Sequence, residues 1–115
     1  MNKARIAVLV SGGGTNLQAL IDAQAAGIIK SGEITLVISN KKGAYALERA
    51  AKAGIRTETV LKKEHPDFEG KLIELLDGDG IDLIVLAGFM SILSERFTNH
   101  YKDRIINVHP SLIPS

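Results

Sequence analysis

The sequence predicts an α/β protein with a doubly wound, mostly parallel sheet, formed as a single domain over 1–115. Two observations predict this class. Short apolar runs, typical of strands covered on both faces, alternate with segments of helical periodicity. Glycines stand where most of the expected helices end. The length of 115 residues is enough for one domain with a core and small for two.

The first half of the chain is expected to form a strand, a helix, a second strand and a second helix. Arg5–Val10 is a continuous apolar run, RIAVLV, which predicts a buried strand. Thr15–Ala26 has leucine and isoleucine at helical spacing before a glycine stop. The run ITLVIS predicts a strand over Ile34–Ser39. Ala44–Ala53 then has the pattern of a helix and stops at another glycine.

The second half repeats the alternation. Arg56–Val60 alternates polar and apolar residues, which predicts a weaker strand. Pro66–Asp77 has helical spacing, with a proline near the first turn, where proline is favoured. The run DLIVLA predicts a second strongly buried strand over Asp82–Ala87. Ser94–Tyr101 is expected to be a helix that begins at a good capping residue, and Arg104–Val108 a last strand.

Composition limits the classes of function. The net charge of +1 creates no general field toward nucleic acid or a membrane surface, so we expect neither as a partner. The chain has no cysteine, which excludes disulfides, thiolate nucleophiles and cysteine-based zinc sites. Its first apolar run is too short to span a bilayer, and no signal-peptide cleavage pattern follows it. We therefore expect a cytoplasmic protein.

The motif SGGGTN follows directly after the first expected strand. In doubly wound folds, ligands bind beyond the carboxyl ends of the strands. Backbone N–H groups at Gly12, Gly13 and Gly14, together with the dipole of the following helix, favour a phosphate there. Thr15 and Asn16 add side-chain donors. The spacing matches neither a dinucleotide motif nor a Walker loop, so a phosphate-bearing substrate fits better. The alternative is a turn needed only for tight packing of strand against helix.

A second candidate site lies at the end of the last strand. Asn107 and His109 alternate, so on an extended segment their side chains lie on the same side. An amide hydrogen-bonds a developing oxyanion, and an imidazole moves a proton near neutral pH, so the pair favours acyl transfer. The alternative is a histidine that only caps a loop.

Other polar residues carry weaker signals. His65 lies in a polar loop, and His100 lies late in a helix, where it suits the dipole. Phe89 and Met90 are expected to be pocket wall or core. Three aspartates flank a turn without the spacing of a calcium loop, and we expect them to be solvated: Asp77, Asp79 and Asp82. The sequence has no cluster of metal-ligating residue types, so we expect no metal site.

Several stretches, in this order, resemble the folate-dependent glycinamide ribonucleotide formyltransferases of purine synthesis: VLVSGGGTNLQALID, VISNKKGAYALERAAKAGI, LIVLAGFMSIL and IINVHPSLIP. Together they cover nearly all of the chain. SGGGTNLQA is the more discriminating motif. NVHPSLIP is shared more widely by enzymes that use 10-formyltetrahydrofolate, among them methionyl-tRNA formyltransferase and formyltetrahydrofolate deformylase.

The resemblance implies a Rossmann-like nucleotide-binding part of a formyltransferase, with roles for particular residues. The loop that ends in Gly14, Thr15 and Asn16 would hold the phosphate of glycinamide ribonucleotide. Asn107 and His109 would be two members of a catalytic trio. The co-substrate 10-formyltetrahydrofolate would transfer its formyl group directly, with no metal and no covalent enzyme intermediate. Its pocket would be lined by Met90, Ser91, Ile92 and Leu93.

The chain departs from the family pattern at two positions, and the family has one further catalytic residue. The family often has arginine where Ser91 stands and a basic side chain near His65, so side-chain contacts to folate are expected to differ here. The third catalytic residue, an aspartate, would lie beyond residue 115, in a segment that also completes the folate pocket. We therefore expect this chain to be the amino-terminal portion of such an enzyme.

That interpretation carries expectations about partners and activity. The carboxyl-terminal segment of the same enzyme is the expected partner. The chain alone is expected to bind phosphate with little transferase activity, and to self-associate through apolar surface that the segment would cover. Two alternatives stand beside it: a non-catalytic binding module for a phosphorylated metabolite, and a related folate-dependent formyltransferase or deformylase.

Overall fold

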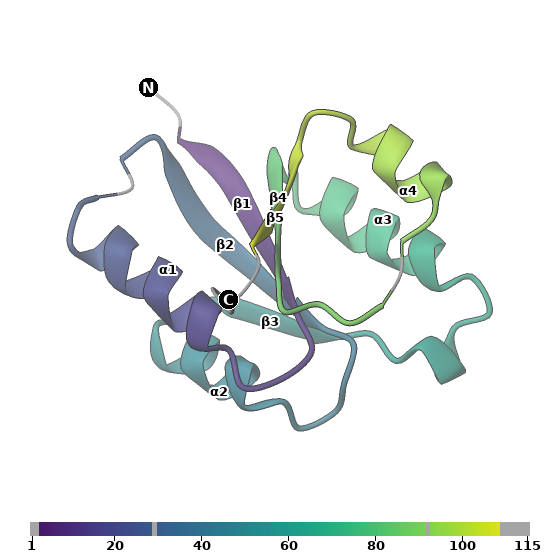
Figure 1. Cartoon of the computed structure of the whole chain (residues 1–115), viewed down its shortest axis with the longest axis horizontal. Coiled ribbons are helices and arrows are strands. Elements are labelled where there is room, and N and C mark those ends of the chain that lie inside the picture. Colours follow the sequence, from purple (N-terminus) through teal and green to yellow (C-terminus); the bar gives the residue numbers. More distant parts are fainter. Residues whose placement is uncertain (1–2, 29, 92, 109–115) are drawn as a thin grey trace, which may run out of the picture.

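Figure 1 shows the computed structural model of the chain, which describes residues 3–28, 30–91 and 93–108. Within these residues five parallel strands form one sheet in the order β3-β2-β1-β4-β5. The strands are β1 (Ala4–Val10), β2 (Gly32–Ser39), β3 (Arg56–Thr59), β4 (Leu83–Ala87) and β5 (Ile105–Val108). The helices are α1 (Thr15–Ala25), α2 (Tyr45–Lys52), α3 (Phe68–Gly78) and α4 (Glu95–His100), with a 3-10 helix η1 (Lys62–Glu64). The doubly wound parallel fold expected from the sequence is confirmed.

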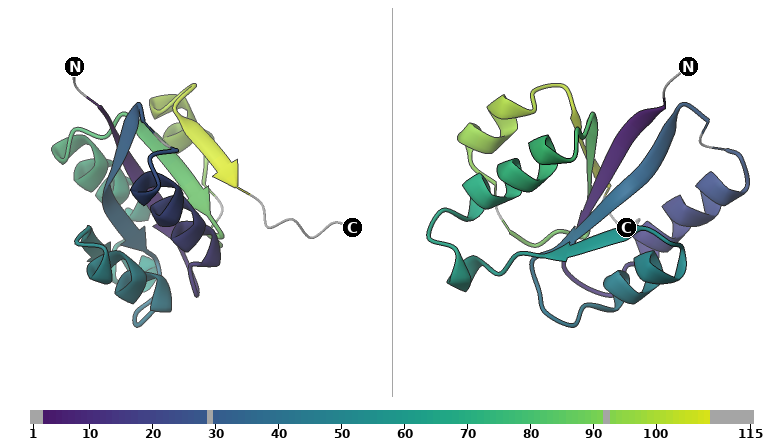
Figure 2. Two further views of the ribbon diagram at one scale, coloured as in Figure 1. Left: turned by 90° about the vertical axis from the view of Figure 1, so that its left-hand side faces the viewer. Right: turned by 180° about the vertical axis from the view of Figure 1, so that it is seen from behind.

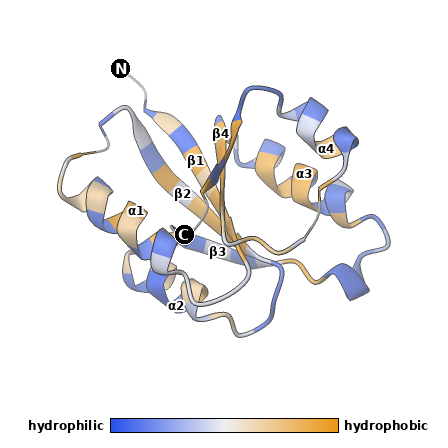
Figure 3. Ribbon diagram, in the orientation of Figure 1, coloured by the Kyte–Doolittle hydropathy of each residue, from blue (hydrophilic) through white to orange (hydrophobic). Residues whose placement is uncertain are grey.

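Helices cover both faces of the sheet, with α1 and α2 on one side and α3 and α4 on the other (Figure 1). Alternate residues of β1 serve the two layers: Val8 packs with α1 and α2, whereas Ala7 and Leu9 pack with α3 and α4. A central strand therefore needs apolar side chains in both directions, which explains its unbroken apolar run. Hydrophobic residues concentrate on the sheet, and β3 is more hydrophilic (Figure 3).

Element ends differ from the sequence expectations, most at α3. The helix begins at Phe68 because the Asp67 side chain accepts a hydrogen bond from the Gly70 N–H (3.2 Å) and caps it, so the expected first turn at Pro66 was wrong. β2 begins at Gly32, two residues before the apolar run, because its ladder with β1 continues to the pair Ala4–Gly32. The other ends shift by one residue or not at all.

The expectation of a solvated side chain was wrong for Asp79, whereas Asp82 is exposed as expected. The Asp79 carboxylate is 14% exposed and accepts from the guanidinium groups of Arg5 and Arg56, each at 3.1 Å. The Asp82 carboxylate accepts from the Arg5 backbone N–H at 2.8 Å. These contacts join the amino ends of the strands, at the edge of the sheet opposite the glycine motif. The partners are far apart in sequence, so residue spacing gave no sign of them.

Asp77 likewise has structural partners. Its carboxylate accepts a hydrogen bond from the Tyr101 hydroxyl (2.8 Å) and lies 2.9 Å from Nε2 of His100. Burial raises the pKa of the Tyr101 hydroxyl well above its usual value, and the bond to the carboxylate raises it further. Tyr101 therefore keeps its proton and holds α3 against the end of α4. His100 contributes here through its contact with the carboxylate, as well as by its place at the end of a helix.

The glycine motif packs tightly against α2 at Gly14. Its φ is 81°, and a methyl group there would lie 2.6 Å from Cβ of Ala46 on α2. We expect Gly14→Ala to lower the free energy of unfolding by at least about 2 kcal/mol, from backbone strain and steric overlap. Urea unfolding measures this change.

The matched control is Gly12→Ala. No heavy atom lies within 4 Å of the position its methyl group would take, so we expect a change below about 1 kcal/mol. Equal losses at the two positions would contradict this account of the loop.

Candidate functional site

The glycine motif and the end of β4 enclose a hollow at the carboxyl edge of the sheet. Its volume is about 170 Å³. It is lined by Gly12, Gly13, Gly14, Thr15, Asn16, Ala87 and Gly88. The structure therefore brings all the residues expected to bind phosphate to one concave surface, next to a strand that is distant in sequence.

The loop presents backbone donors to this hollow. α1 begins at Thr15, with Gly14 as its N-cap, and the N–H groups of a first helical turn have no acceptor within the helix. The cap makes no side-chain hydrogen bond, and the first turn of α1 contains no acidic residue that would repel an anion. The positive end of the helix dipole is therefore open to a phosphate.

α2 holds the loop from the other side. The Ala46 N–H donates to the Gly12 carbonyl (3.2 Å), and Nε of Arg49 donates to the Gly13 carbonyl (2.7 Å). Arg49 also donates to the Gln18 side chain on α1 (3.2 Å). The loop carbonyls are thus engaged by α2. Sequence analysis missed Arg49, because only the packing of α2 against the loop brings it there.

A hydrogen-bonded chain of side chains connects the loop to two other strand ends. The Ser11 hydroxyl, whose residue is 3% exposed, donates to Oδ1 of Asn40 (2.6 Å) and accepts from the Met90 N–H (2.7 Å). Nδ2 of Asn40 donates to the Ser91 hydroxyl (3.0 Å). Sequence analysis did not assign Ser11 or Asn40 a role. Their signal was a polar residue placed directly after an apolar strand.

The residues expected to line a folate pocket are spread over different environments. Met90 is 74% exposed, so it is not core, whereas Phe89 and Leu93 pack against the layer of α3 and α4. Ser91 is half-buried through its bond to Asn40. Ile92 lies outside the described residues. Their role toward folate stays a prediction.

Asn107 lies on β5, the edge strand of the sheet (Figure 2). It is exposed and pairs with Leu86 of β4, one residue before Ala87, which lines the hollow. Because Val108 points toward α1, Asn107 projects to the opposite face. His109 lies outside the described residues, so its pairing with Asn107 stays a prediction.

Positive charge gathers at the same edge of the sheet. A hollow of about 360 Å³ beyond β2 and β3 is lined by Asn40, Leu61 and the lysines Lys41, Lys42, Lys62 and Lys63. We call it the lysine pocket. These charges raise the local concentration of anionic ligands near the glycine loop.

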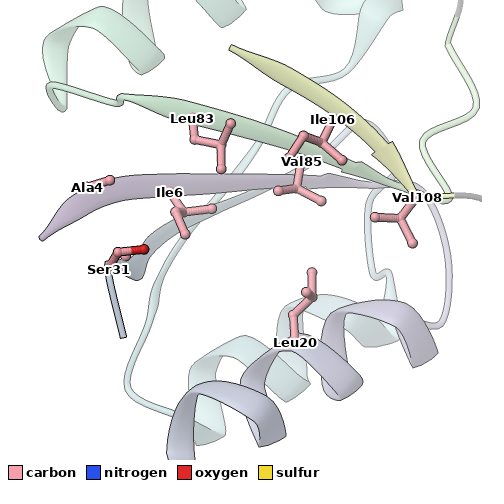
Figure 4. Close-up of a pocket in the computed structure, with 9 residues that line it drawn as sticks. Ala4, Ile6, Leu20, Ser31, Leu83, Val85, Ile106 and Val108 are labelled. Carbon is pink, nitrogen blue, oxygen red and sulfur yellow. The ribbon is translucent and has the colours of Figure 1, made fainter. Parts of the chain in front are cut away.

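A different hollow lies on the α1 face of the sheet. It is an apolar groove of about 260 Å³, in which Leu20 of α1 faces side chains of the strands across an open space (Figure 4). The strand residues that line it include Ile6, Leu83, Val85, Ile106 and Val108. Among the described residues, only α1 and α2 cover this face, and α2 packs against β2 and β3. The part of the sheet formed by β4 and β5 is therefore left open.

No group of three or more histidine, cysteine, aspartate or glutamate side chains in 3–28, 30–91 and 93–108 is arranged to hold a metal ion. None of the helices seen there has the length and hydrophobicity needed to cross a membrane.

Known proteins resemble this chain in sequence and in fold. A sequence profile described as formyl transferase matches residues 4–115. The chain is 47% identical over 112 residues to the phosphoribosylglycinamide formyltransferase of Escherichia coli strain K12, covering 95% of this chain and 52% of that protein. It is 50% identical over 118 residues to the trifunctional purine biosynthetic protein adenosine-3 of Drosophila pseudoobscura pseudoobscura, covering 97% of this chain and 8% of that protein.

Solved structures agree in fold. The phosphoribosylglycinamide formyltransferase of Coxiella burnetii, in complex with CHES, superimposes with a TM-score of 0.90 at 47% identity, covering 99% of this chain and 55% of that one. Glycinamide ribonucleotide transformylase 1 of Symbiobacterium toebii gives 0.89 at 40% identity, covering 98% and 54%. The chain thus spans about half the length of these bacterial relatives. With a profile match over nearly its whole length, the chain belongs to the formyl transferase family.

Proposed function

We propose that this chain supplies the nucleotide-binding half of an enzyme that transfers a formyl group from 10-formyltetrahydrofolate to the amine of glycinamide ribonucleotide, in purine synthesis. The observation that carries the proposal is the hollow formed by the glycine loop and the end of β4. The relatives named for this activity match the chain over nearly all its length. The absence of cysteine fits a reducing compartment, and a cytoplasmic location is part of the same proposal.

The phosphate of the ribonucleotide binds in this hollow, on the backbone N–H groups of Gly12, Gly13 and Gly14 and on the side chains of Thr15 and Asn16. The small lining residues let the anion approach the backbone closely. α2 keeps the loop carbonyls engaged, and Arg49 adds a positive charge beside the loop. The lysine pocket steers both anionic substrates toward this edge.

The chemistry takes place beside this hollow. The substrate amine attacks the formyl carbon, and the carbonyl oxygen becomes an oxyanion in the tetrahedral intermediate. Asn107 donates its amide N–H to that oxygen. His109 takes part in moving the amine proton toward folate N10, which leaves when its bond to the formyl carbon breaks. Asn107 suits this role because its strand pairs with β4, whose last residue lines the hollow, and its side chain is exposed.

The folate co-substrate occupies the surface formed by Met90, Ser91, Ile92 and Leu93. This segment follows Gly88, which lines the phosphate hollow, so the two substrates lie side by side. Proximity of the two reactants supplies much of the acceleration. Ser91 and the lysines near His65 make the side-chain contacts to folate.

The apolar groove is the surface on which the rest of the enzyme packs. A right-handed crossover from β5 to a further parallel strand would place its helix on the α3 and α4 face, so that connection would leave the groove open. A later segment that returns across the β5 edge can cover it. The relatives contain about as much chain again as this one, which is enough for such a segment. Self-association of the isolated chain through the same groove is the competing outcome.

Gly13→Ala tests the phosphate site. No heavy atom lies within 4 Å of the position its methyl group would take, so the fold is retained while the methyl group intrudes on an anion in the hollow. We expect affinity for glycinamide ribonucleotide to fall by about tenfold or more, a loss of about 1.4 kcal/mol, in isothermal titration.

Gly78→Ala is the matched control. It places a methyl group in equally open space at the end of α3, away from the hollow, and should leave the affinity unchanged. Equal affinities for all three proteins would exclude the glycine loop as the phosphate site.

Asn107→Ala tests the catalytic role. The chain is fused to the remaining carboxyl-terminal part of the Escherichia coli relative, and formyl transfer is followed in the chimera. We expect kcat to fall by about 100-fold or more, because an oxyanion donor is lost. Asn99→Ala, on the exposed surface of α4, should have no effect. A chimera that binds both substrates without transferring the formyl group, with the parent relative active in the same assay, would favour the non-catalytic binding module.

Ile106→Thr tests the groove. Ile106 is 49% exposed in this chain, so the substitution should leave its melting temperature nearly unchanged. In the fused protein Ile106 is buried, and the same substitution should cost about 1 kcal/mol. Ile28→Thr is the control, because Ile28 is exposed outside the groove. Equal effects of Ile106→Thr in the two proteins, with a concentration-dependent dimer of the chain alone, would favour self-association.

A further inference from the structure

The hydrogen-bonded chain Ser11–Asn40–Ser91 joins two loops that the proposed function uses for different substrates. Ser11 directly precedes the glycine loop, and its hydroxyl accepts from the Met90 N–H (2.7 Å). The same hydroxyl donates to Asn40 (2.6 Å), which donates to Ser91 (3.0 Å). The segment Gly88–Ser91 is therefore bonded to Ser11 by two routes, one direct and one through Asn40, which follows β2.

Because Ser11 is buried, the hydrogen bonds of its hydroxyl are costly to break. A serine hydroxyl has one proton to donate, and here both its donor and one acceptor position are in use. Ser11 is 3% exposed, so water cannot readily replace a lost partner. A movement of Ser11 with the glycine loop must carry Met90 and Asn40 with it, or leave a buried polar group unpaired.

Hydrogen bonds from both the backbone and the side chain hold Asn40 in place. Its backbone N–H donates to the Val10 carbonyl (3.2 Å), which fixes it beside the end of β1. Its side chain then uses both amide ends, the oxygen toward Ser11 and the nitrogen toward Ser91. Asn40 belongs to neither loop, and its side chain bridges residues at the start of one and the end of the other.

We propose that Ser11 and Asn40 couple the two loops, so that phosphate bound on the glycine loop sets the position of Gly88–Ser91, the segment that leads into the folate surface. The coupling rests on the proposed phosphate site. Both residues are positioning residues. Because coupling between two sites is reciprocal, folate bound at the second loop strengthens phosphate binding by the same factor.

The test uses the ¹⁵N-labelled 115-residue chain titrated with ribose 5-phosphate at constant ionic strength, followed by amide NMR. We expect the Gly13 and Met90 amide signals to shift with the same midpoint. In Ser11→Ala and in Asn40→Ala the Gly13 signal should still respond, while the Met90 response falls by about half or more. A direct effect of the nearby anion on Met90 would survive in both variants.

Ser39→Ala is the matched control. Ser39 is fully buried, and its hydroxyl is also hydrogen-bonded, to the backbone of Lys41, but it bonds to neither loop. The Met90 response should persist in this variant. If Ser11→Ala fails to fold, Asn40→Ala alone decides the outcome, because it leaves both loops unaltered in sequence.

The outcomes separate the two proposals. A response at Gly13 with none at Met90 in the unaltered chain overturns the coupling and leaves the phosphate site standing. A Met90 response of equal size in the unaltered chain and both variants also overturns the coupling. No response at Gly13 overturns the phosphate site itself, and the coupling with it.

Discussion

The parallel pairing of β1 with both β2 and β4 is the constraint on which the rest of the molecule depends. Parallel strands end at the same edge of a sheet, so three segments distant in sequence meet where β1, β2 and β4 stop. The glycine loop, Asn40 and the Gly88–Ser91 segment are neighbours for this reason alone. The two apolar layers hold the pairing in place, because every inner strand buries side chains on both faces.

The edge strand β5 serves two purposes through its alternation. Ile106 and Val108 face the apolar groove beside α1, whereas Asn107 faces the other side and is exposed. The surface on which we propose that the rest of the enzyme packs and the surface proposed for catalysis are therefore opposite sides of one short strand. Packing of the carboxyl-terminal half on the groove would fix β5, and with it the position of Asn107.

Local patterns predicted most of this fold, and long-range contacts explain what they could not predict. The apolar runs of β1 and β4 identified the central strands, and the glycine motif located the hollow. Arg49, by contrast, reaches Gly13 only through the packing of α2, and no spacing in the sequence indicates that contact. Asp79 at the other edge was misjudged for the same reason, since Arg5 lies 74 residues from it. The expected start of α3 at Pro66 was wrong, because the Asp67 side chain caps the helix and its first residue is Phe68.

A crystal structure of the chain with glycinamide ribonucleotide tests the central claim most directly. The account predicts the phosphate in the hollow, with its oxygens about 3 Å from backbone nitrogens of the glycine loop and from the side chains of Thr15 and Asn16, and the ribose directed toward β5. The lysine pocket concentrates positive charge around another hollow at this edge. A phosphate bound there, between Lys41 and Lys63, with no density over the glycine loop, would contradict the account.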